Sequence, residues 1–440
     1  MAATNPTFPK PARRPHCLVR FGARFAYALL SVFALPFALW RLAKRGWRAG
    51  DDEVVRWREY FGFCPPPPAD DGRAVVWLHA VSVGEAAAAA ELVRDLQKEY
   101  RLILTHTTAA GGGFWRRHFD GAGVVVCACP LDIPFAARIF FRRCRPALGI
   151  VMEAEYWPNL ITSARAAGCK LVLANARLNK TSARKYANIA PLMRECAVRF
   201  DAVCAQHRND ARRLRFFGAA NVCVAGNMKF DRKLDEKAAQ SGRQWREDMP
   251  PQKPVLLVAG SRPGEEERIL SAMAKTGATD KLHIVWAPRH PQRAAVLATM
   301  LNRRGIPFAR RSEGDTIGKS RFYIADTIGE MDAFYAFCDI ALICGSFAPY
   351  GGQNPIEAMQ HNIAAVIGPH AENYRQLVRN AVKTGALVQA QNADDAIQTC
   401  LTLANDIPRR QQIAAATKTF HNQNRGALAK TRKTITPLLR

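Results

Sequence analysis

Acidic residues are scarce in this sequence relative to basic ones. Its 440 residues include 37 Asp and Glu against 63 Lys and Arg, which gives a formal net charge of +26 at pH 7. Such an excess favours anionic partners such as nucleic acid, acidic lipid or phosphorylated substrates. The sequence lacks a motif that interleaves aromatic and basic residues for nucleic-acid recognition, so we expect no nucleic-acid partner.

Paired cysteine motifs are also missing, although twelve cysteines are present. The closest pair, Cys127 and Cys129, lies in an apolar run with no second pair nearby, which is not the spacing of a zinc site. The pattern therefore predicts buried, reduced thiols in a cytoplasmic protein rather than a disulfide framework.

A charge-free segment near the amino terminus is short for a membrane span. It runs from Phe25 to Trp40, whereas a spanning helix needs about 20 residues. The segment lacks the small-residue cleavage pattern of a signal peptide, so we expect it to be retained. Basic residues on both sides indicate a short or interfacial anchor on anionic lipid. The alternative is a buried helix of the first domain, although a core helix normally shows a polar stripe.

Short β-rich apolar runs alternate with longer amphipathic stretches in two successive series. This alternation predicts βαβ units with parallel strands buried on both faces. We expect an α/β protein with two doubly wound Rossmann-like domains, whose strand ends face an interdomain cleft where ligands bind. The expected parts are an anchor at 1–48, a proline-rich spacer at 49–72, a first domain at 73–231, a linker at 232–253 and a second domain at 254–440.

Glu85 follows the first predicted strand and lies in the first turn of a predicted helix. A carboxylate there could accept a proton from an acceptor hydroxyl. Ser82 and Glu85 also have the spacing of a capping box, in which both side chains satisfy free N–H groups of the helix. Spacing alone favours the cap.

Further charged residues follow two other strands of the first domain. Glu153 and Glu155 end the strand at 147–153, so one carboxylate could face the cleft while the other supports structure. Lys229 follows the last strand and could stabilise charge that develops as a phosphate departs. A solvated surface lysine is the alternative.

The second domain has sequences typical of anion binding. The run 260–265 turns a strand into a helix, and Arg289 follows another strand, where its planar fork suits a phosphate or carboxylate. Glycines at 345–352 free backbone N–H groups, and a helix beginning near 354–355 directs its positive end at an anion. Glu357 in its first turn could accept hydrogen bonds from ribose hydroxyls.

Taken in order, these runs and several others resemble the family of 3-deoxy-D-manno-octulosonic acid (Kdo) transferases. The resemblance spans about residues 20–425. The matching runs are HAVSVGE (79–85), EAEYWPN (153–159), NARLNKTS (175–182), GNMKFD (226–231), GSRPGEE (260–266), APRHP (287–291), DTIGEMDAFY (326–335), GGQNPIE (351–357) and GPHAENY (368–374).

The resemblance implies a GT-B fold and an inverting transfer of Kdo from CMP-Kdo to lipid IVA, a lipid A precursor, with no metal and no cofactor. It implies attachment to anionic lipid on the cytoplasmic face of the bacterial inner membrane, for lipopolysaccharide biosynthesis. The resemblance assigns the role of general base to Glu85, although the spacing of Ser82 and Glu85 alone favours a helix cap. It assigns transition-state stabilisation to Glu153 and Lys229. The implied CMP-binding residues are Pro288, Arg289, Ile328, Gly329, Glu330, Asn354, Pro355, Ile356 and Glu357.

The sequence departs from the family pattern at several donor-side positions. Arg262 and Pro263 replace Thr-His, Ile328 replaces Met, Gln353 replaces His and Cys344 replaces Gly.

Two other functions remain open: a GT-B transferase with a UDP-sugar donor, and a non-enzymatic basic protein that binds nucleotide or anionic lipid. The runs GNMKFD and EAEYWPN do not fit the UDP-sugar enzyme.

Overall fold

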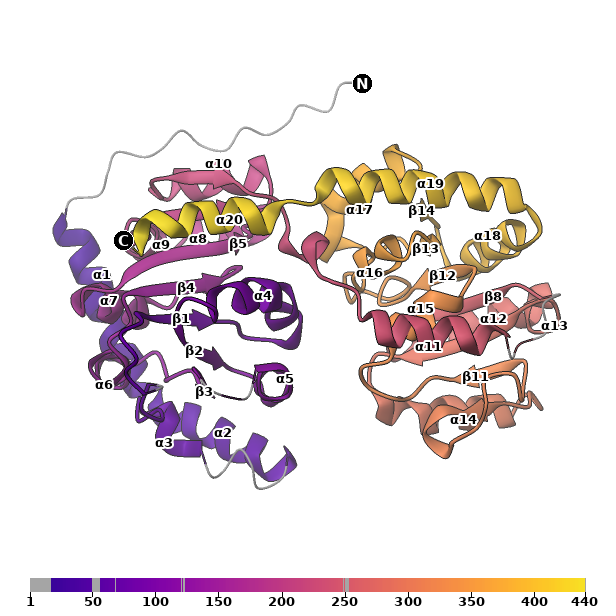
Figure 1. Cartoon of the computed structure of the whole chain (residues 1–440), viewed down its shortest axis with the longest axis horizontal. Helices are drawn as coiled ribbons and strands as arrows, with labels where there is room; N and C mark the ends of the chain where they lie inside the picture. The colour runs from indigo at the N-terminus through magenta and orange to yellow at the C-terminus, as the bar shows by residue number, and fades with distance from the viewer. Residues whose placement is uncertain are drawn as a thin grey trace. The chain divides into compact units, whose positions relative to one another are not determined.

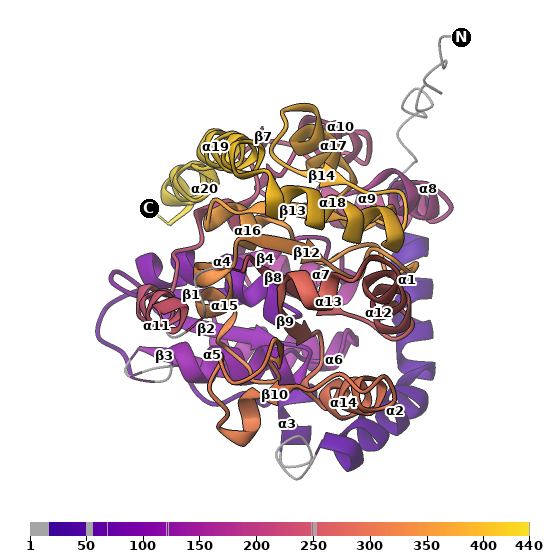
Figure 2. The same ribbon diagram turned by 90° about the vertical axis from the view of Figure 1, so that its right-hand side faces the viewer.

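The structure is a computed structural model that describes residues 17–49, 56–67, 69–119, 121, 123–247, 249 and 253–439. The chain divides into two compact units. The first unit is Met1–Arg232 with Arg425–Arg440, and the second is Lys233–Asn424. Figures 1 and 2 show that each unit has a central sheet with helices on both faces.

The first unit is built on a seven-stranded parallel sheet. Its five inner strands are almost fully buried because helices cover both faces, whereas the two edge strands are partly exposed. The strands are β1 (Val75–His79), β2 (Arg101–His106), β3 (Val124–Ala128), β4 (Leu148–Met152), β5 (Lys170–Ala176), β6 (Ala202–Ala205) and β7 (Val222–Val224). Their order is β3-β2-β1-β4-β5-β6-β7, so the direction of winding reverses between β1 and β4. The carboxyl ends beside this reversal are where doubly wound sheets bind ligands.

The helices of the first unit connect these strands or flank the sheet. They are α1 (Cys17–Phe33), α2 (Leu35–Ala49), α3 (Trp57–Tyr60), α4 (Val83–Leu96), α5 (Ala109–Phe119), α6 (Pro134–Cys144), α7 (Pro158–Ala166), α8 (Lys180–Ala187), α9 (Ala190–Ala197), α10 (Arg208–Phe216) and α20 (Ala427–Ile435), with the 3-10 turns η2 (Met228–Asp231) and η6 (Thr436–Leu438). In β4, a Cβ at Gly149 would lie 2.6 Å from the Trp77 ring, so glycine lets this large side chain fill the core.

The second unit repeats the design with a second seven-stranded parallel sheet. Its strands are β8 (Val255–Ser261), β9 (His283–Pro288), β10 (Ala309–Arg310), β11 (Phe322–Ile324), β12 (Ile340–Ile343), β13 (Ala364–Ile367) and β14 (Val388–Gln389), in the order β10-β11-β9-β8-β12-β13-β14. Its α-helices are α11 (Glu236–Glu247), α12 (Glu265–Thr276), α13 (Ala278–Lys281), α14 (Ala294–Asn302), α15 (Met331–Phe337), α16 (Ile356–Gln360), α17 (Arg375–Lys383), α18 (Ala393–Asn405) and α19 (Ile407–Asn424). The prediction of two doubly wound α/β domains is confirmed.

Two segments belong to other units than the domain boundaries predicted from the sequence assign. The segment 232–253 was expected to be a linker, but α11 packs on α15 of the second unit, with Trp245 against Phe334 and Phe337. The carboxyl-terminal helix α20 was expected in the second domain, but it packs on the first unit. There Arg432 pairs with Asp95 on α4 at 2.9 Å. Amphipathic sequence predicts a helix without specifying the surface that buries it.

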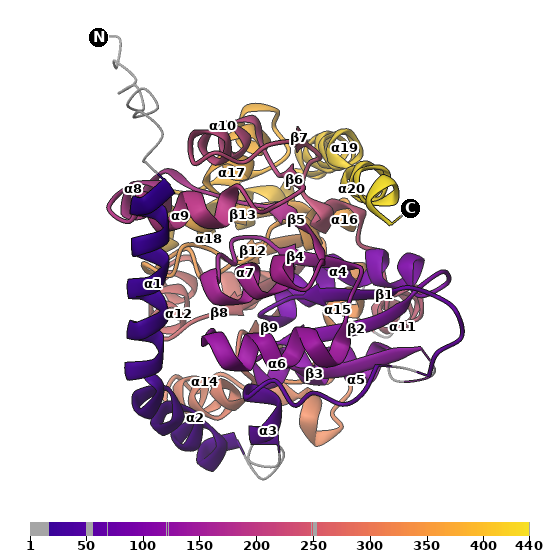
Figure 3. The same ribbon diagram turned by 90° about the vertical axis from the view of Figure 1, so that its left-hand side faces the viewer.

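The apolar amino-terminal segment forms two helices, α1 and α2, and neither is the fully buried core helix that was the alternative interpretation. Helix α1 packs on α7 and α9 along one side of the unit (Figure 3), so it is partly docked. Its other face leaves large apolar side chains exposed, including Leu30 at 66% and Phe33 at 79%. Among the described residues no single helix is long and apolar enough to cross a membrane, but Phe21–Phe33 and Leu35–Lys44, bent by 48°, pass that test as a pair.

Candidate active site

Glu85 lies where β1 leads into α4, and its carboxylate is tied to the connecting loop. Oε2 accepts a hydrogen bond from the backbone N–H of Val81 at 2.7 Å. The Ser82 hydroxyl is the N-cap of α4 and accepts from the N–H of Glu85 at 3.4 Å. The predicted cap is therefore present, and it fixes the Glu85 carboxylate at the carboxyl end of β1 rather than excluding a second role.

The loop before Glu85 is held by the segment that follows β2. The carbonyl of Val81 accepts hydrogen bonds from the N–H groups of Thr107 and Thr108, and from the Thr108 hydroxyl at 3.1 Å. The same hydroxyl accepts from the N–H of Gly111 at 3.2 Å, at the start of α5. Thr108 thus fixes the peptide whose neighbouring N–H binds Glu85. Sequence reasoning missed this residue, because its partner is 27 positions away.

The surroundings of Glu85 raise its pKa to about 7. Burial is the main cause, because it disfavours the charged form, and the negative charge of Glu153 acts in the same direction. The bond from Val81 and the positive charge of Lys229 act in the opposite direction. A carboxylate with a pKa near neutrality suits a general base, since it can take up a proton at the operating pH.

Glu153 and Lys229 form an ion pair close enough for both charges to act on Glu85. Lys229 Nζ lies 3.0 Å from Glu153 Oε1, and both side chains are mostly buried. Glu153 follows β4 with φ at 55°, a left-handed conformation that is uncommon for a glutamate and that clusters at functional sites. The structure thus brings together the three residues that the sequence proposed as catalytic.

Asn175, at the end of β5, links Glu153 to the backbone of Met228, the residue before Lys229. Its Nδ2 donates to Glu153 Oε1 at 3.4 Å, while its Oδ1 accepts from the N–H of Met228 at 3.0 Å. Asn175 is fully buried and also left-handed, with φ at 51°. An asparagine at the carboxyl end of a parallel strand was the available signal in the sequence, but its role was not recognised.

Glu155 lies near the same group of charges. Burial raises its pKa, and a 2.6 Å hydrogen bond from Trp157 Nε1 to Oε2 acts against that increase. Its carboxylate also contributes to the raised pKa of Glu85.

In the second unit, Arg289 projects from the end of β9 with its side chain exposed. Its backbone N–H donates to the carbonyl of Ser261 at 3.0 Å, so the start of this loop is fixed to β8. No carboxylate of the described residues lies within ion-pair distance of its guanidinium group. Arg289, directly after Pro288, is therefore available to bind an anion.

The glycine-rich loop after β12 already binds an anionic group of the protein itself. The N–H groups of Gly345 and Phe347 each donate to the Glu265 carboxylate at 2.8 Å, and so does the N–H of Arg262. Glu265 is fully buried in the first turn of α12. The interpretation of these two segments as free phosphate-binding loops is therefore wrong at these N–H groups, because an internal carboxylate occupies them.

Glu330 is similarly engaged within the second unit. Arg311 donates to both of its carboxylate oxygens, at 2.7 and 3.0 Å, and the Thr327 hydroxyl also donates to it. The bonds from Arg311 lower the pKa of Glu330. Next to it, Gly329 has φ at 95° and Ile328 is 76% exposed, so the backbone of this turn remains open to a ligand.

The segment around Asn354 begins the short helix α16. Asn354 Oδ1 accepts from the N–H of Ile356 at 3.2 Å, and its Nδ2 lies 3.4 Å from Glu357 Oε1. Pro355 is the N-cap residue, and α16 ends at Gln360, which limits the helix dipole to little more than one turn. These residues and Arg289 follow strands at the same edge of the sheet.

No group of three or more His, Cys, Asp and Glu side chains that could hold a metal ion occurs in the part of the chain that the structure describes.

Two doubly wound parallel sheets, each with its candidate residues at the strand ends, define the GT-B class of glycosyltransferase fold. Solved structures agree with this class. A glycosyltransferase from Rickettsia africae ESF-5 matches 84% of this chain and 99% of its own, with a TM-score of 0.56 and 10% identity. Anabaena Alr3699/HepE in complex with UDP matches 83% and 99%, with a TM-score of 0.58 and 13% identity. At these identities the likeness shows the fold alone.

Sequence comparison identifies the family within this class. The model of the family described as 3-deoxy-D-manno-octulosonic-acid transferase (kdotransferase) matches residues 55–232. The 3-deoxy-D-manno-octulosonic acid transferase of Bordetella pertussis is 36% identical over 91% of this chain and 94% of its own length. The enzyme of that name from Haemophilus influenzae is 31% identical over 87% and 91%. The chain belongs to the Kdo transferase family and is a glycosyltransferase, as the resemblance predicted.

Proposed function

We propose that the chain transfers Kdo from CMP-Kdo to lipid IVA with inversion at the anomeric carbon, during lipopolysaccharide biosynthesis. Family membership supports the transferred sugar. The observation that supports the mechanism best is the Glu85 carboxylate, whose pKa of about 7 is set by burial and by the charges of Glu153 and Lys229. A base with this pKa accepts a proton at neutral pH without being fully protonated beforehand.

In the proposed reaction, Glu85 removes the proton of an acceptor hydroxyl as its oxygen attacks the anomeric carbon of Kdo. The bond from that carbon to the phosphate oxygen of CMP-Kdo breaks, and its electron pair leaves with CMP. Lys229, held by Glu153, supplies a fixed positive charge where negative charge develops. Glu85 ends the step protonated and returns its proton to solvent.

The donor is proposed to bind at the strand ends of the second unit. Arg289 has an exposed guanidinium group without a carboxylate partner among the described residues, which suits the single phosphate of CMP. The open turn at Ile328 and Gly329 and the segment 354–357 would contact the nucleoside. The engaged Glu330 positions this turn through Arg311. A UDP-sugar donor remains the second candidate, because structures of this fold include a complex with UDP.

We also propose that α1 and α2 attach the chain to anionic lipid at the cytoplasmic face of the bacterial inner membrane. The support is the row of exposed apolar side chains on both helices, with Arg41 and Lys44 over the rings of Phe37 and Trp40 on α2. Aromatic rings with cations beside them are typical of helices that lie in the membrane interface.

Incubation of the full-length protein with CMP-Kdo and lipid IVA, followed by mass spectrometry, tests donor and acceptor together. The expected product is lipid IVA that has gained one or more Kdo residues, with release of CMP. Parallel reactions with UDP-sugars should give no product. Transfer from a UDP-sugar without transfer from CMP-Kdo would contradict the proposal.

A further inference from the structure

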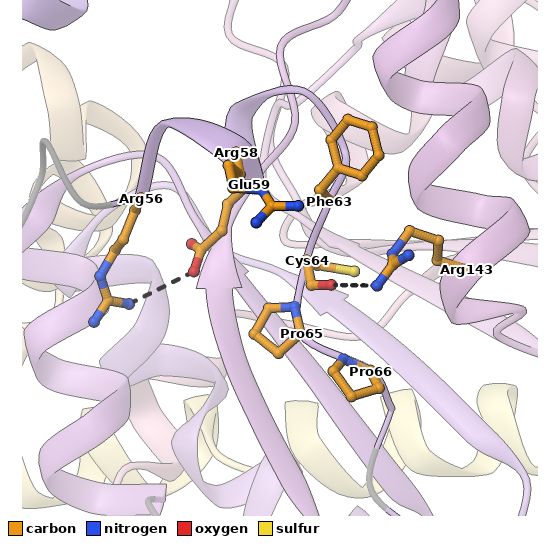
Figure 4. Close-up of a pocket in the computed structure, with 8 residues that line it drawn as sticks. All are labelled: Arg56, Arg58, Glu59, Phe63, Cys64, Pro65, Pro66 and Arg143. Carbon is orange, nitrogen blue, oxygen red and sulfur yellow. Dashed lines mark hydrogen bonds and ion pairs between the residues drawn. The ribbon is translucent and has the colours of Figure 1, made fainter.

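The first unit contains a pocket that the proposed transfer does not use. It has a volume of about 320 Å³ and lies between the segment before β1 and the last turn of α6 (Figure 4). Its lining residues are Arg56, Arg58, Glu59, Phe63, Cys64, Pro65, Pro66 and Arg143. Three of these eight side chains are arginines, and Glu59 is the one carboxylate among them.

The charges of this pocket are not balanced. Glu59 Oε1 lies 4.0 Å from Arg56 Nη1, while Oε2 accepts from the N–H of Ala128 at 2.6 Å. No carboxylate of the described residues lies within ion-pair distance of Arg58 or Arg143. Figure 4 shows their guanidinium groups flanking Cys64, whose carbonyl accepts a 3.4 Å bond from Arg143. Two positive charges are therefore left to attract an anion.

The wall of the pocket is fixed by the core of the first unit. Cys64 is 1% exposed and packs in the hydrophobic core against Cys144. Gly62 has φ at 88°, and a Cβ there would lie 2.2 Å from the carbonyl oxygen of Ala136, so this turn lies directly on α6. Pro65 and Pro66 restrict the backbone further. The backbone of this wall is therefore already ordered before a ligand binds, although the Arg58 and Arg143 side chains are exposed.

The pocket also lies close to the proposed membrane surface. It is built on the segment that follows α2, and the views in Figures 1 and 3 place α3 beside α2. Helix α2 exposes Phe37 at 58% and Trp40 at 56%. The pocket therefore lies near the helix that is proposed to contact lipid.

We propose that this pocket binds the phosphate monoester head of a membrane-embedded amphiphile. A phosphate monoester carries a charge of about −1.5 to −2 at pH 7, which matches the two guanidinium groups that have no carboxylate partner among the described residues. Arginine forks bind phosphate oxygens in pairs, and a monoester has three terminal oxygens to offer them. The inference rests on the proposed membrane attachment and adds the headgroup chemistry that is recognised there.

Vesicle cosedimentation of the full-length protein tests this specificity. Phosphatidylcholine vesicles carry either phosphatidic acid, which is a monoester, or phosphatidylglycerol, a diester, adjusted to equal surface charge. The wild-type protein should prefer phosphatidic acid by about tenfold. Arg58→Gln with Arg143→Gln should abolish the preference, and Arg58→Lys with Arg143→Lys, which keeps the charge but loses the forks, should abolish most of it.

The control is a second pair of exposed arginines of the same unit, Arg117→Gln with Arg138→Gln, which removes equal charge outside the pocket and should leave the preference intact. Equal binding of both vesicle types by the wild-type protein, or equal loss of preference in the control, overturns the proposal. Binding to neither vesicle type contradicts membrane attachment instead. Calorimetry with inorganic phosphate separates the sources: no heat supports a lipid-borne phosphate, whereas binding as tight as to vesicles overturns it.

Discussion

Lys229 Nζ lies 3.0 Å from Glu153 Oε1, and the two charges act on the pKa of Glu85 in opposite directions. Glu153→Gln should lower that pKa, because it removes a neighbouring negative charge, and Lys229→Met should raise it. The rise of kcat/KM with pH should move to lower pH in the first variant and to higher pH in the second. Lys229→Met should also reduce transfer by about 10²-fold. Shifts in the same direction would show that this ion pair does not tune the base.

Thr108 should matter for catalysis although it lies outside the reacting groups. Thr108→Val removes the hydroxyl that donates to the Val81 carbonyl, so the loop that binds Glu85 loosens. We expect kcat to fall about fivefold or more, on the scale of about 1 kcal/mol for one hydrogen bond. Thr107→Val is the matched control, because Thr107 contacts Val81 through its backbone N–H, which valine keeps. Equal losses of kcat would show a general packing effect.

Arg289→Ala should weaken donor binding without loss of stability. The exposed side chain contributes little to folding, whereas one charge-assisted contact to phosphate corresponds to about tenfold in affinity. Calorimetric titration with CMP measures this change. Arg303→Ala, which removes another exposed arginine from the second unit, should leave CMP affinity unchanged. Unchanged affinity in the Arg289 variant would remove this residue from the site.

Substitutions on the two faces of α1 should affect protein stability and membrane attachment separately. On the docked face, Tyr27 donates to Asp132 at 2.8 Å, and Asp132 also accepts from the N–H of Leu160 at 2.7 Å. Tyr27→Phe should therefore cost about 1–3 kcal/mol of unfolding free energy and leave vesicle binding unchanged. Phe33→Ala, on the exposed face, should do the reverse. Denaturant unfolding and vesicle cosedimentation measure the two effects, and a loss of stability in the Phe33 variant would contradict the assignment of faces.

The sequence predicted most of the fold because buried parallel strands are continuous apolar runs. Strands such as β1 and β12 are of this kind, and the charged residues that follow strands of one sheet meet at one edge. Strand β10, with two residues, has no run to detect. The docking of α20 on the first unit depends on which surface is left uncovered after folding, and local pattern carries no information on that.

The positions of candidate residues were predictable where a residue directly follows a strand, as with Glu153 and Arg289, or lies in the first turn of the next helix, as with Glu85. The site was not predictable where a partner arrives from a distant segment. The pairing of Arg311 with Glu330 and the capture of glycine-loop N–H groups by Glu265 both depend on tertiary contacts. Glu265 shows the limit most clearly, because a loop that looks suited to phosphate is filled by an internal carboxylate.

We propose that the Glu85 carboxylate acts as a base and not only as a support of its loop. Glutamine keeps the side-chain length and an oxygen that can accept from the N–H of Val81, but it cannot take up a proton near neutral pH. The folded-state pKa of about 7 lies above the value of about 4.3 in an unfolded chain. Wild-type stability therefore falls as pH rises from about 4.3 to 7, by up to about 4 kcal/mol.

Glu85→Gln should remove this pH dependence and leave the variant at least as stable as the wild-type protein at pH 8. Ser82→Ala, by contrast, should cost about 1 kcal/mol through the lost cap and keep the base. The most direct measurement is the rate of Kdo transfer by Glu85→Gln at pH 8, together with its unfolding free energy. We expect the rate to fall by about 10²-fold or more in a protein of undiminished stability. Near-wild-type transfer by this variant would contradict the account and leave Glu85 as a structural cap.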